Sequence, residues 1–279
     1  MKLYGVVNMD IVGSRKIKDR QQFQTKLNQT ISRMNEKYHN ILLCPAAITL
    51  GDEWQLITGR PSESYNLVHE FQQFLWEDHL DLYAGIGIGE LSTPVFDDLR
   101  KMDGPCFHNA REAINIAKNV NKLKNNYNIN KLNRVFFLTG QIPYDRLDFN
   151  ILNFFYMSKS RYNDSAKQTM QEIAATIEKN IKRNAGDILI RKILLEKAIN
   201  LIIENNEILK AKMTKKQKEI YISYFRLGSY RKIIRSGTGS CKETTGGISQ
   251  KLNNASYFTI QRNHSMVSEL IEYTCSTGA

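Results

Sequence analysis

Apolar and polar positions follow two different rhythms along the first half of the chain. Short apolar runs rich in β-branched and aromatic residues predict strands, and apolar residues spaced three or four apart predict amphipathic helices. The predicted strands are residues 3–9, 41–50, 54–58, 80–89 and 134–139. The predicted helices are residues 20–38, 61–75 and 110–120. This order of elements predicts an α+β fold, a ferredoxin-like palm with additions.

The strand at residues 80–89 carries an unusual glycine pattern. Gly85, Gly87 and Gly89 alternate with isoleucines, so one face of this strand has almost no side chains. Either another backbone or a ligand approaches that face closely, or the glycines mark a bend in a central strand.

Longer helical patterns fill the second half of the chain. Residues 188–209 have a wide apolar face, which fits a helical connector that also carries a homodimer contact. Further on, Ile248 and Leu252 lie one helical turn apart, residues 253–255 read as a turn, and a second helix begins its buried side at Thr259 and Ile260. We therefore divide the chain into a palm (1–141), a helical connector (142–211) and a C-terminal helix-turn-helix domain (212–279).

The net charge of +11 is concentrated at the end of the chain. Residues 1–141 hold 17 basic and 15 acidic side chains and residues 142–211 hold 11 and 9, whereas residues 212–279 hold 11 and 4. A basic helix-turn-helix predicts contact with duplex DNA, although an acidic protein partner would select the same charge. The candidate DNA-binding residues are Lys251, Tyr257, Thr259, Gln261 and Arg262.

The remaining composition favours a cytoplasmic protein without membrane insertion. The four cysteines form no Cys-x-x-Cys pair, so neither a disulfide framework nor a zinc site is indicated. Asn8, Asp10 and Arg15 interrupt the first apolar residues too early for a signal peptide. No stretch reaches the roughly 20 apolar residues of a spanning helix.

Carboxylates at strand ends are the candidate chemistry. Asp10 ends the first predicted strand, and Asp52 and Glu53 follow Gly51 at the tip of the predicted hairpin 41–58. If the two strands are neighbours in one sheet, Asp10 and Asp52 point at one spot. They would then hold Mg²⁺ or Mn²⁺ through oxygen ligands, as is usual for sites that bind a nucleoside triphosphate. The alternative is that both aspartates are ordinary turn residues.

Several motifs together resemble the SatD family of bacterial proteins. They are Asp10-Ile11-Val12-Gly13-Ser14, Thr49-Leu50-Gly51-Asp52-Glu53-Trp54-Gln55, Gly85-Ile86-Gly87-Ile88-Gly89-Glu90, Asp103-Gly104-Pro105 with Ala110-Arg111-Glu112-Ala113, and the terminal helix-turn-helix. The N-terminal domain of that family is similar to the palm shared by class III nucleotide cyclases, GGDEF diguanylate cyclases and the CRISPR-associated polymerase.

This resemblance assigns roles to individual residues. The hairpin tip resembles the GGDEF signature, with its first glycine replaced and tryptophan in place of phenylalanine. The first motif resembles the Asp-Ile-x-Gly of the cyclases, whose aspartate binds metal and whose following amides receive phosphate. The resemblance implies the catalytic residues Asp10, Asp52 and Arg111, with metal on Asp10 and Asp52, and the nucleotide-binding residues Ile11, Val12, Gly13, Ser14, Gly51, Glu53 and Lys118.

The third predicted helix resembles the corresponding helix of GGDEF proteins better than that of the class III cyclases. Residues 110–118 are similar to the GGDEF helix whose lysine reaches the triphosphate, and Lys118 stands at that position. The cyclases place an asparagine four residues before an arginine, whereas Asn109 and Arg111 are two apart. The expected function is a nucleotide- and metal-binding palm coupled to a DNA-binding domain, acting as a nucleotidyltransferase or cyclase. The alternative is a non-enzymatic regulator or assembly protein whose degenerate palm senses a nucleotide.

Overall fold

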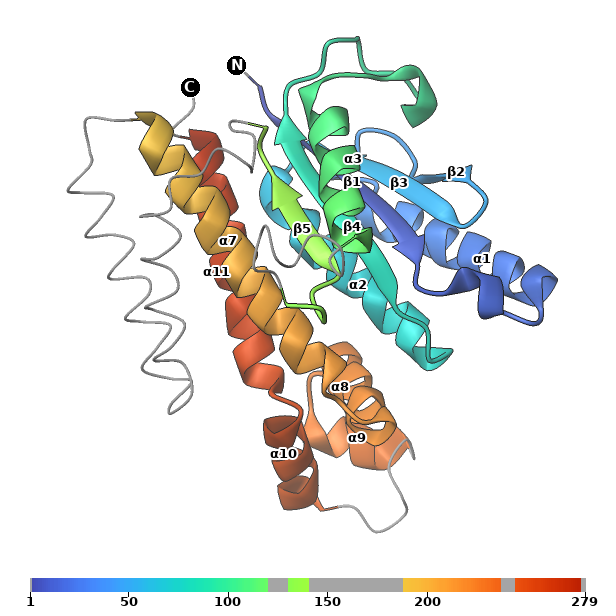
Figure 1. Cartoon of the computed structure of the whole chain (residues 1–279). Helices are drawn as coiled ribbons and strands as arrows, with labels where there is room; N and C mark the ends of the chain where they lie inside the picture. The colour runs from blue at the N-terminus through green and yellow to red at the C-terminus, as the bar shows by residue number, and fades with distance from the viewer. Residues whose placement is uncertain (1, 120–129, 141–187, 237–243, 277–279) are drawn as a thin grey trace.

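The computed structural model describes residues 2–119, 130–140, 188–236 and 244–276, and this part of the chain is a mixed α+β protein (Figure 1). The strands are β1 (Tyr4–Ile11), β2 (Ala47–Leu50), β3 (Glu53–Thr58), β4 (Leu82–Gly89) and β5 (Val135–Leu138). The helices beside the sheet are α1 (Arg20–Tyr38), α2 (Ser64–Glu77) and α3 (Pro105–Lys118), with short 3-10 turns at Ser14–Lys16, Pro61–Glu63 and Leu99–Lys101. The C-terminal helices are α7 (Ile188–Ala211), α8 (Lys215–Leu227), α9 (Tyr230–Ser236), α10 (Thr245–Asn254) and α11 (Tyr257–Ser276). The order of strands and helices predicted for residues 1–141 is confirmed in the described part of that range.

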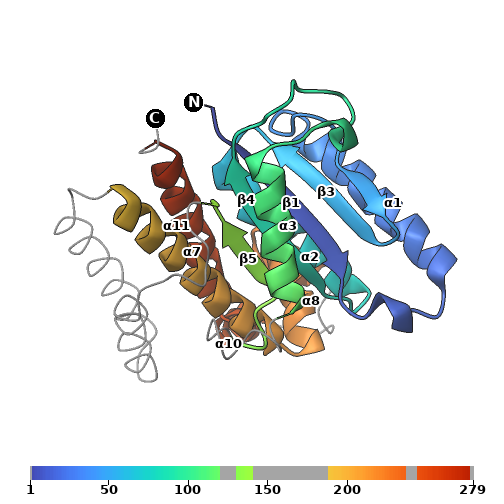
Figure 2. The same cartoon turned by 45° about the horizontal axis from the view of Figure 1, so that its top comes forward.

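The described strands form one open sheet in the order β2-β3-β1-β4-β5. All neighbours are antiparallel except β4 and β5, which are parallel. The apolar side chains of α1 and α2 pack on one face of the sheet and those of α3 on the other. Figure 2 shows α3 alone in front of the sheet.

The glycines of β4 explain why α3 lies so close to the sheet. A Cβ atom added to Gly85 would stand 2.2 Å from the backbone nitrogen of Ile114, and one added to Gly87 would stand 2.1 Å from that of Ala110. Only residues without side chains allow this contact. Of the alternatives that the sequence left open, the structure shows the close approach of another backbone, that of α3.

The C-terminal helices share a core with the sheet rather than standing apart from it. Ala198 and Ile202 of α7 and Val267 and Ile271 of α11 belong to the same apolar cluster as the buried face of β1. Figure 1 shows α7 and α11 side by side next to β5. On the helix proposed to carry a homodimer contact, the described apolar side chains of Leu195, Ala198, Ile199, Ile202 and Ile203 therefore pack within the chain. Residues 142–187 of the predicted connector lie outside the described residues.

A second apolar cluster joins α8, α9, α10 and the start of α11 to Trp76 of α2. Ile248 and Leu252 are fully buried in it, as their one-turn spacing predicted. A turn at Ala255 and Ser256 leads from α10 to α11, and Ser256 has a positive φ of 55°. No helix in the described ranges is long and apolar enough to cross a membrane.

Candidate functional site

A cleft opens between α3 and the β2–β3 hairpin. It encloses about 410 Å³, its open mouth included. Because α3 rests on the glycine face of β4, it leaves the neighbouring part of β1 and β3 uncovered. The residues that line the cleft are Asn8, Met9, Thr49, Glu53, Trp54, Gln55, Arg111, Ile114, Asn115 and Lys118.

Lys118 joins the carboxylates at one end of this cleft. It is the last residue of α3, and its Nζ donates to Oδ2 of Asp10 at 2.7 Å and to Oε1 of Glu53 at 2.6 Å. Burial alone would lower the pKa of Lys118, but the two ion pairs raise it above its ordinary value. The lysine is therefore fully charged at neutral pH.

Asp52 approaches the same spot from the hairpin tip. It follows Gly51, whose φ of 61° is in the left-handed region that glycine adopts without strain. Burial is the main cause that raises the pKa of Asp10; Lys118 opposes the rise, and the nearby Asp52 carboxyl adds to it. The Oδ2 atom of Asp52 is buried and has no hydrogen-bond partner. The structure thus brings together Asp10, Asp52, Glu53 and Lys118, which lie far apart in the sequence.

The carboxylates of Asp10 and Asp52 fit Mg²⁺ or Mn²⁺ if water and phosphate supply the other ligands of the ion. Within the described ranges, no three His, Cys, Asp or Glu side chains gather as a metal cage. Mg²⁺ usually needs only one or two protein carboxylates, because water and substrate phosphates complete its coordination. Two adjacent carboxylates with an unpartnered buried oxygen are suited to a metal that arrives with phosphate.

The loop after β1 offers fewer phosphate donors than expected. The Val12 amide donates to the Asp81 carbonyl at 2.9 Å, and the Ile11 side chain is buried in the core. The Val12 amide is therefore already bonded in this conformation, and its assignment to phosphate stays a prediction. The backbone amides of Gly13 and Ser14 have no acceptor among the described residues, and Gly13 turns with a φ of 68°.

One face of α3 supplies the opposite wall of the cleft. Arg111, Asn115 and Lys118 are spaced by four and three residues and all line it. Arg111 is exposed and has no ion-pair partner in the described part of the chain. Asn109 points the other way, is buried, and donates to the Ile88 carbonyl at 2.8 Å. Asn109 and Arg111 therefore do not act as a pair.

Asn8, Gln55 and Asn115 also line the cleft but were not among the residues predicted for it. Asn8 and Gln55 face each other across β1 and β3, and the Gln55 amide donates to the Asn8 side chain. Both interrupt apolar strands on the face that carries Asp10 and Glu53, which is a period-two signal. Asn115 could have been found from its position one helical turn after Arg111.

A family profile matches the N-terminal part of the chain. The profile of the SatD family matches residues 4–176. The chain belongs to the SatD family. No curated protein and no solved structure matches the chain.

The SatD match ends before the C-terminal helices, where the candidate DNA-binding residues lie. Tyr257 is buried against the rings of Tyr221 and Tyr224, and the Gln261 amide donates to the Tyr221 hydroxyl at 2.8 Å. These two side chains face inward because the start of α11 packs against Tyr221 and Tyr224 of α8. Thr259 and Lys251 are half-buried, and Arg262 is exposed. The five residues therefore do not form one exposed face.

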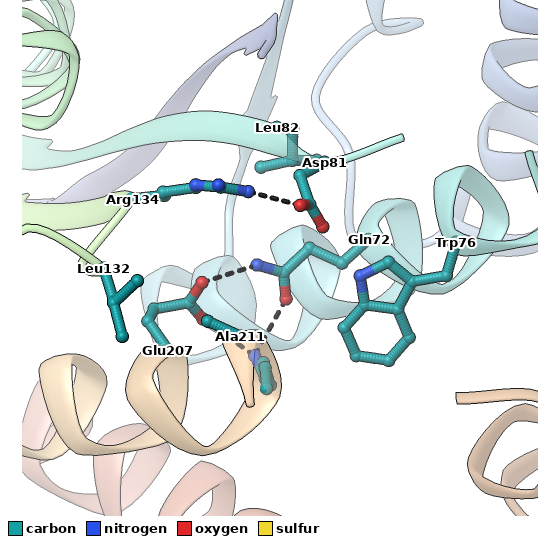
Figure 3. A pocket seen from close by; sticks show the side chains of 9 residues that line it. Gln72, Trp76, Asp81, Leu82, Leu132, Arg134, Glu207 and Ala211 are labelled. Carbon is teal, nitrogen blue, oxygen red and sulfur yellow. Dashed lines mark hydrogen bonds and ion pairs between the residues drawn. The ribbon is translucent and has the colours of Figure 1, made fainter. Parts of the chain in front are cut away.

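A second, smaller hollow of about 270 Å³ lies between α2, the start of β4 and α7 of this SatD protein (Figure 3). The side-chain amide of Gln72 donates to Glu207 at 2.9 Å, and Lys210 donates to the side-chain oxygen of Gln72 at 2.8 Å. Asp81 forms an ion pair with Arg134 across the same hollow. Its polar groups bind one another, which makes this place a structural junction.

Proposed function

We propose that the N-terminal palm binds a nucleoside triphosphate together with Mg²⁺ or Mn²⁺ in the cleft beside α3. The observation that carries this proposal is the meeting of Asp10 and Asp52, with the buried Asp52 oxygen left without a partner. The Asp52 carboxyl beside Asp10 helps to raise the pKa of Asp10, and a bound cation would favour the charged form of Asp10.

The strand order supports a palm related to the ferredoxin-like fold. In β2-β3-β1-β4 all pairs are antiparallel, and α1 and α2 cover the same face. This arrangement supports a β-α-β-β-α-β unit, which brings the end of β1 next to the β2–β3 turn. A metal and a nucleotide would bind where the end of β1 meets the β2–β3 turn.

Individual residues then take the following roles. Asp10 and Asp52 hold the metal, which supplies positive charge to the phosphates. The amides of Gly13 and Ser14 and the side chain of Arg111 bind phosphate oxygens, and Lys118 neutralises the charge of the triphosphate. If the bound nucleotide reacts, a ribose 3′-hydroxyl attacks the α-phosphorus and pyrophosphate leaves, in nucleotidyl transfer or cyclisation.

Calorimetry with ATP and GTP in Mg²⁺ tests the binding proposal. Asp10→Asn and Asp52→Asn should each weaken metal-dependent nucleotide binding by at least about tenfold, because even changes around metal ligands cost roughly 10–100-fold in affinity. Asp78→Asn is the matched control, since Asp78 forms a surface ion pair with Lys26. Wild-type affinity in both aspartate variants would place the nucleotide elsewhere.

Turnover separates an enzyme from a sensor. Incubation of the full chain with labelled ATP or GTP and Mg²⁺ or Mn²⁺ should release pyrophosphate if the palm is a nucleotidyltransferase or cyclase. Nucleotide binding without release of pyrophosphate would support the alternative, a non-enzymatic regulator that senses a nucleotide.

Binding to duplex DNA is a second candidate function. Its support is the excess of 11 basic over 4 acidic residues in 212–279, and Arg231, Lys232 and Arg235 of α9 are all exposed. The full chain should bind duplex DNA at low salt. Combining Arg231→Ala with Arg235→Ala should flatten the salt dependence by roughly one unit for each phosphate that is no longer neutralised. If the wild type does not bind duplex DNA at low salt, an acidic protein partner becomes the better explanation of the charge.

A further inference from the structure

Lys118 stands where a cation of the palm would have to bind. Its Nζ contacts Oδ2 of Asp10 at 2.7 Å and Oε1 of Glu53 at 2.6 Å, and Asp10 lies beside Asp52. The ammonium therefore supplies the positive charge that the carboxylates need in the absence of a metal. A divalent ion on Asp10 would have to share an oxygen with this ammonium, and two cations a few ångströms apart repel each other.

We propose that Lys118 is a resident cation of the metal site, which a divalent metal must displace and which a triphosphate receives. The proposal rests on the proposed function and adds to it that the binding of metal and the binding of nucleotide depend on each other. Metal alone binds weakly, and metal and nucleotide bind cooperatively.

The position of Lys118 allows this exchange. It is the last residue of α3, its side chain is 26% exposed, and it lines the cleft together with Arg111 and Asn115. The long side chain can turn its ammonium from the carboxylates toward the cleft while the helix stays in place. Phosphates bound in the cleft would meet Arg111 and Lys118 on the same helix face, so the lysine exchanges one set of anions for another.

Cooperativity follows from this competition. A triphosphate that binds Lys118 frees Asp10 for the metal, and by linkage the metal raises the affinity for the triphosphate by the same factor. The two partly exposed ion pairs set the size of the effect. Such pairs are each worth a modest amount, so breaking both corresponds to a change in metal affinity of about tenfold.

Binding of Mn²⁺ alone, followed by electron paramagnetic resonance, tests the proposal without turnover. Lys118→Met should bind Mn²⁺ about tenfold more tightly than the wild type. Lys118→Arg keeps the charge and should resemble the wild type. The matched control is Lys37→Met, which removes an ion pair with Glu70 away from the cleft and should also leave Mn²⁺ affinity unchanged.

A second measurement needs no variant. Reductive methylation of the Lys118 ammonium in the wild type, followed by mass spectrometry, should speed up several-fold when saturating Mn²⁺ takes the carboxylates. Adding ATP or GTP with Mn²⁺ should slow it again, because the phosphates then hold the lysine.

The outcomes separate this proposal from the proposed function. If Lys118→Met and the wild type bind Mn²⁺ equally and methylation is unaffected by Mn²⁺, competition is refuted while the metal site stands. If none of the proteins binds Mn²⁺, with or without ATP or GTP, the metal site and the competition are refuted together.

Discussion

Single residues decide whether the cleft can form. Gly85 and Gly87 let α3 rest directly on β4, and this position puts Arg111, Asn115 and Lys118 over the edge of β1. Any Cβ atom at either glycine would meet backbone atoms of α3, which cannot turn aside as a flexible side chain can.

Gly87→Ala should therefore destabilise the protein and weaken the site. The added Cβ would lie 2.1 Å from the Ala110 nitrogen and 2.4 Å from the Cys106 carbonyl oxygen. Overpacking of this kind costs about 1–3 kcal/mol, and the shift of α3 should also weaken nucleotide binding. Urea unfolding measures the first effect and calorimetry the second.

Gly246→Ala is the control for that prediction. A Cβ there has no neighbour closer than 3.9 Å, and alanine in helix α10 should leave stability equal or slightly higher. Equal stability of Gly87→Ala and the wild type would show that α3 does not depend on the glycine face.

At the scale of elements, a buried polar junction holds α2 against the C-terminal helices. The His69 Nε2 accepts from the Tyr221 hydroxyl at 2.9 Å, and the His264 ring stacks on Tyr65 with centroids 4.1 Å apart. Burial is the main cause that lowers the pKa of both histidines well below 6.5, and the nearby Lys210 lowers both further. Oε1 of Glu207 lies 2.9 Å from Nζ of Lys210, and this ion pair compensates the charge of the lysine.

These histidines predict a loss of stability in mild acid. Both are neutral in the folded protein, so below pH 6.5 the unfolded chain binds more protons and the free energy of unfolding decreases as the pH decreases. Each histidine contributes up to about 1.4 kcal/mol per pH unit. His264→Phe keeps an aromatic ring next to Tyr65 but removes one proton-binding group. The free energy of unfolding should therefore decline less steeply between pH 6.5 and pH 5, by the contribution of one histidine.

The exposed His39 is the control for the acid prediction. His39→Gln should leave the slope of unfolding free energy against pH unchanged, as measured by urea titrations at several pH values. A slope that His264→Phe also leaves unchanged would mean that His264 is protonated in the folded protein.

The same junction shows what sequence could not predict. Periodicity predicted the order of strands and helices around the sheet and the buried pair Ile248 and Leu252, because these follow from local spacing. It placed Tyr257 and Gln261 on an outer face, since polar side chains usually face water. Their partner Tyr221 lies on α8, far away in the sequence, and no local pattern reports such a partner. For the same reason the carboxylates were predicted as candidates, whereas their ion pairs with Lys118 were not.

At the scale of the whole molecule, Asp81 connects the cleft to the C-terminal helices. Its carbonyl accepts from the Val12 amide beside the loop of Gly13. Its carboxylate pairs with Arg134 and, at 3.3 Å, with Lys218 of α8. Burial would raise the pKa of Asp81, but these two cations lower it below its ordinary value, so it is ionised at neutral pH.

Asp81→Asn should loosen the docking of α8. Removing two partly exposed ion pairs should cost about 1–2 kcal/mol of stability. Hydrogen exchange measured by mass spectrometry should rise in peptides from α8. Asp98→Asn, at the surface pair with Arg100, should leave exchange in α8 unchanged, and an equal result for both variants would contradict a docking role for Asp81.

Anomalous diffraction from crystals grown with Mn²⁺ and a non-hydrolysable ATP or GTP analogue tests the metal site most directly. We predict a manganese peak within about 2.5 Å of carboxylate oxygens of both Asp10 and Asp52, with the phosphates beside it and the Lys118 ammonium moved toward them. A nucleotide bound elsewhere, or manganese bound away from both aspartates, would contradict the account.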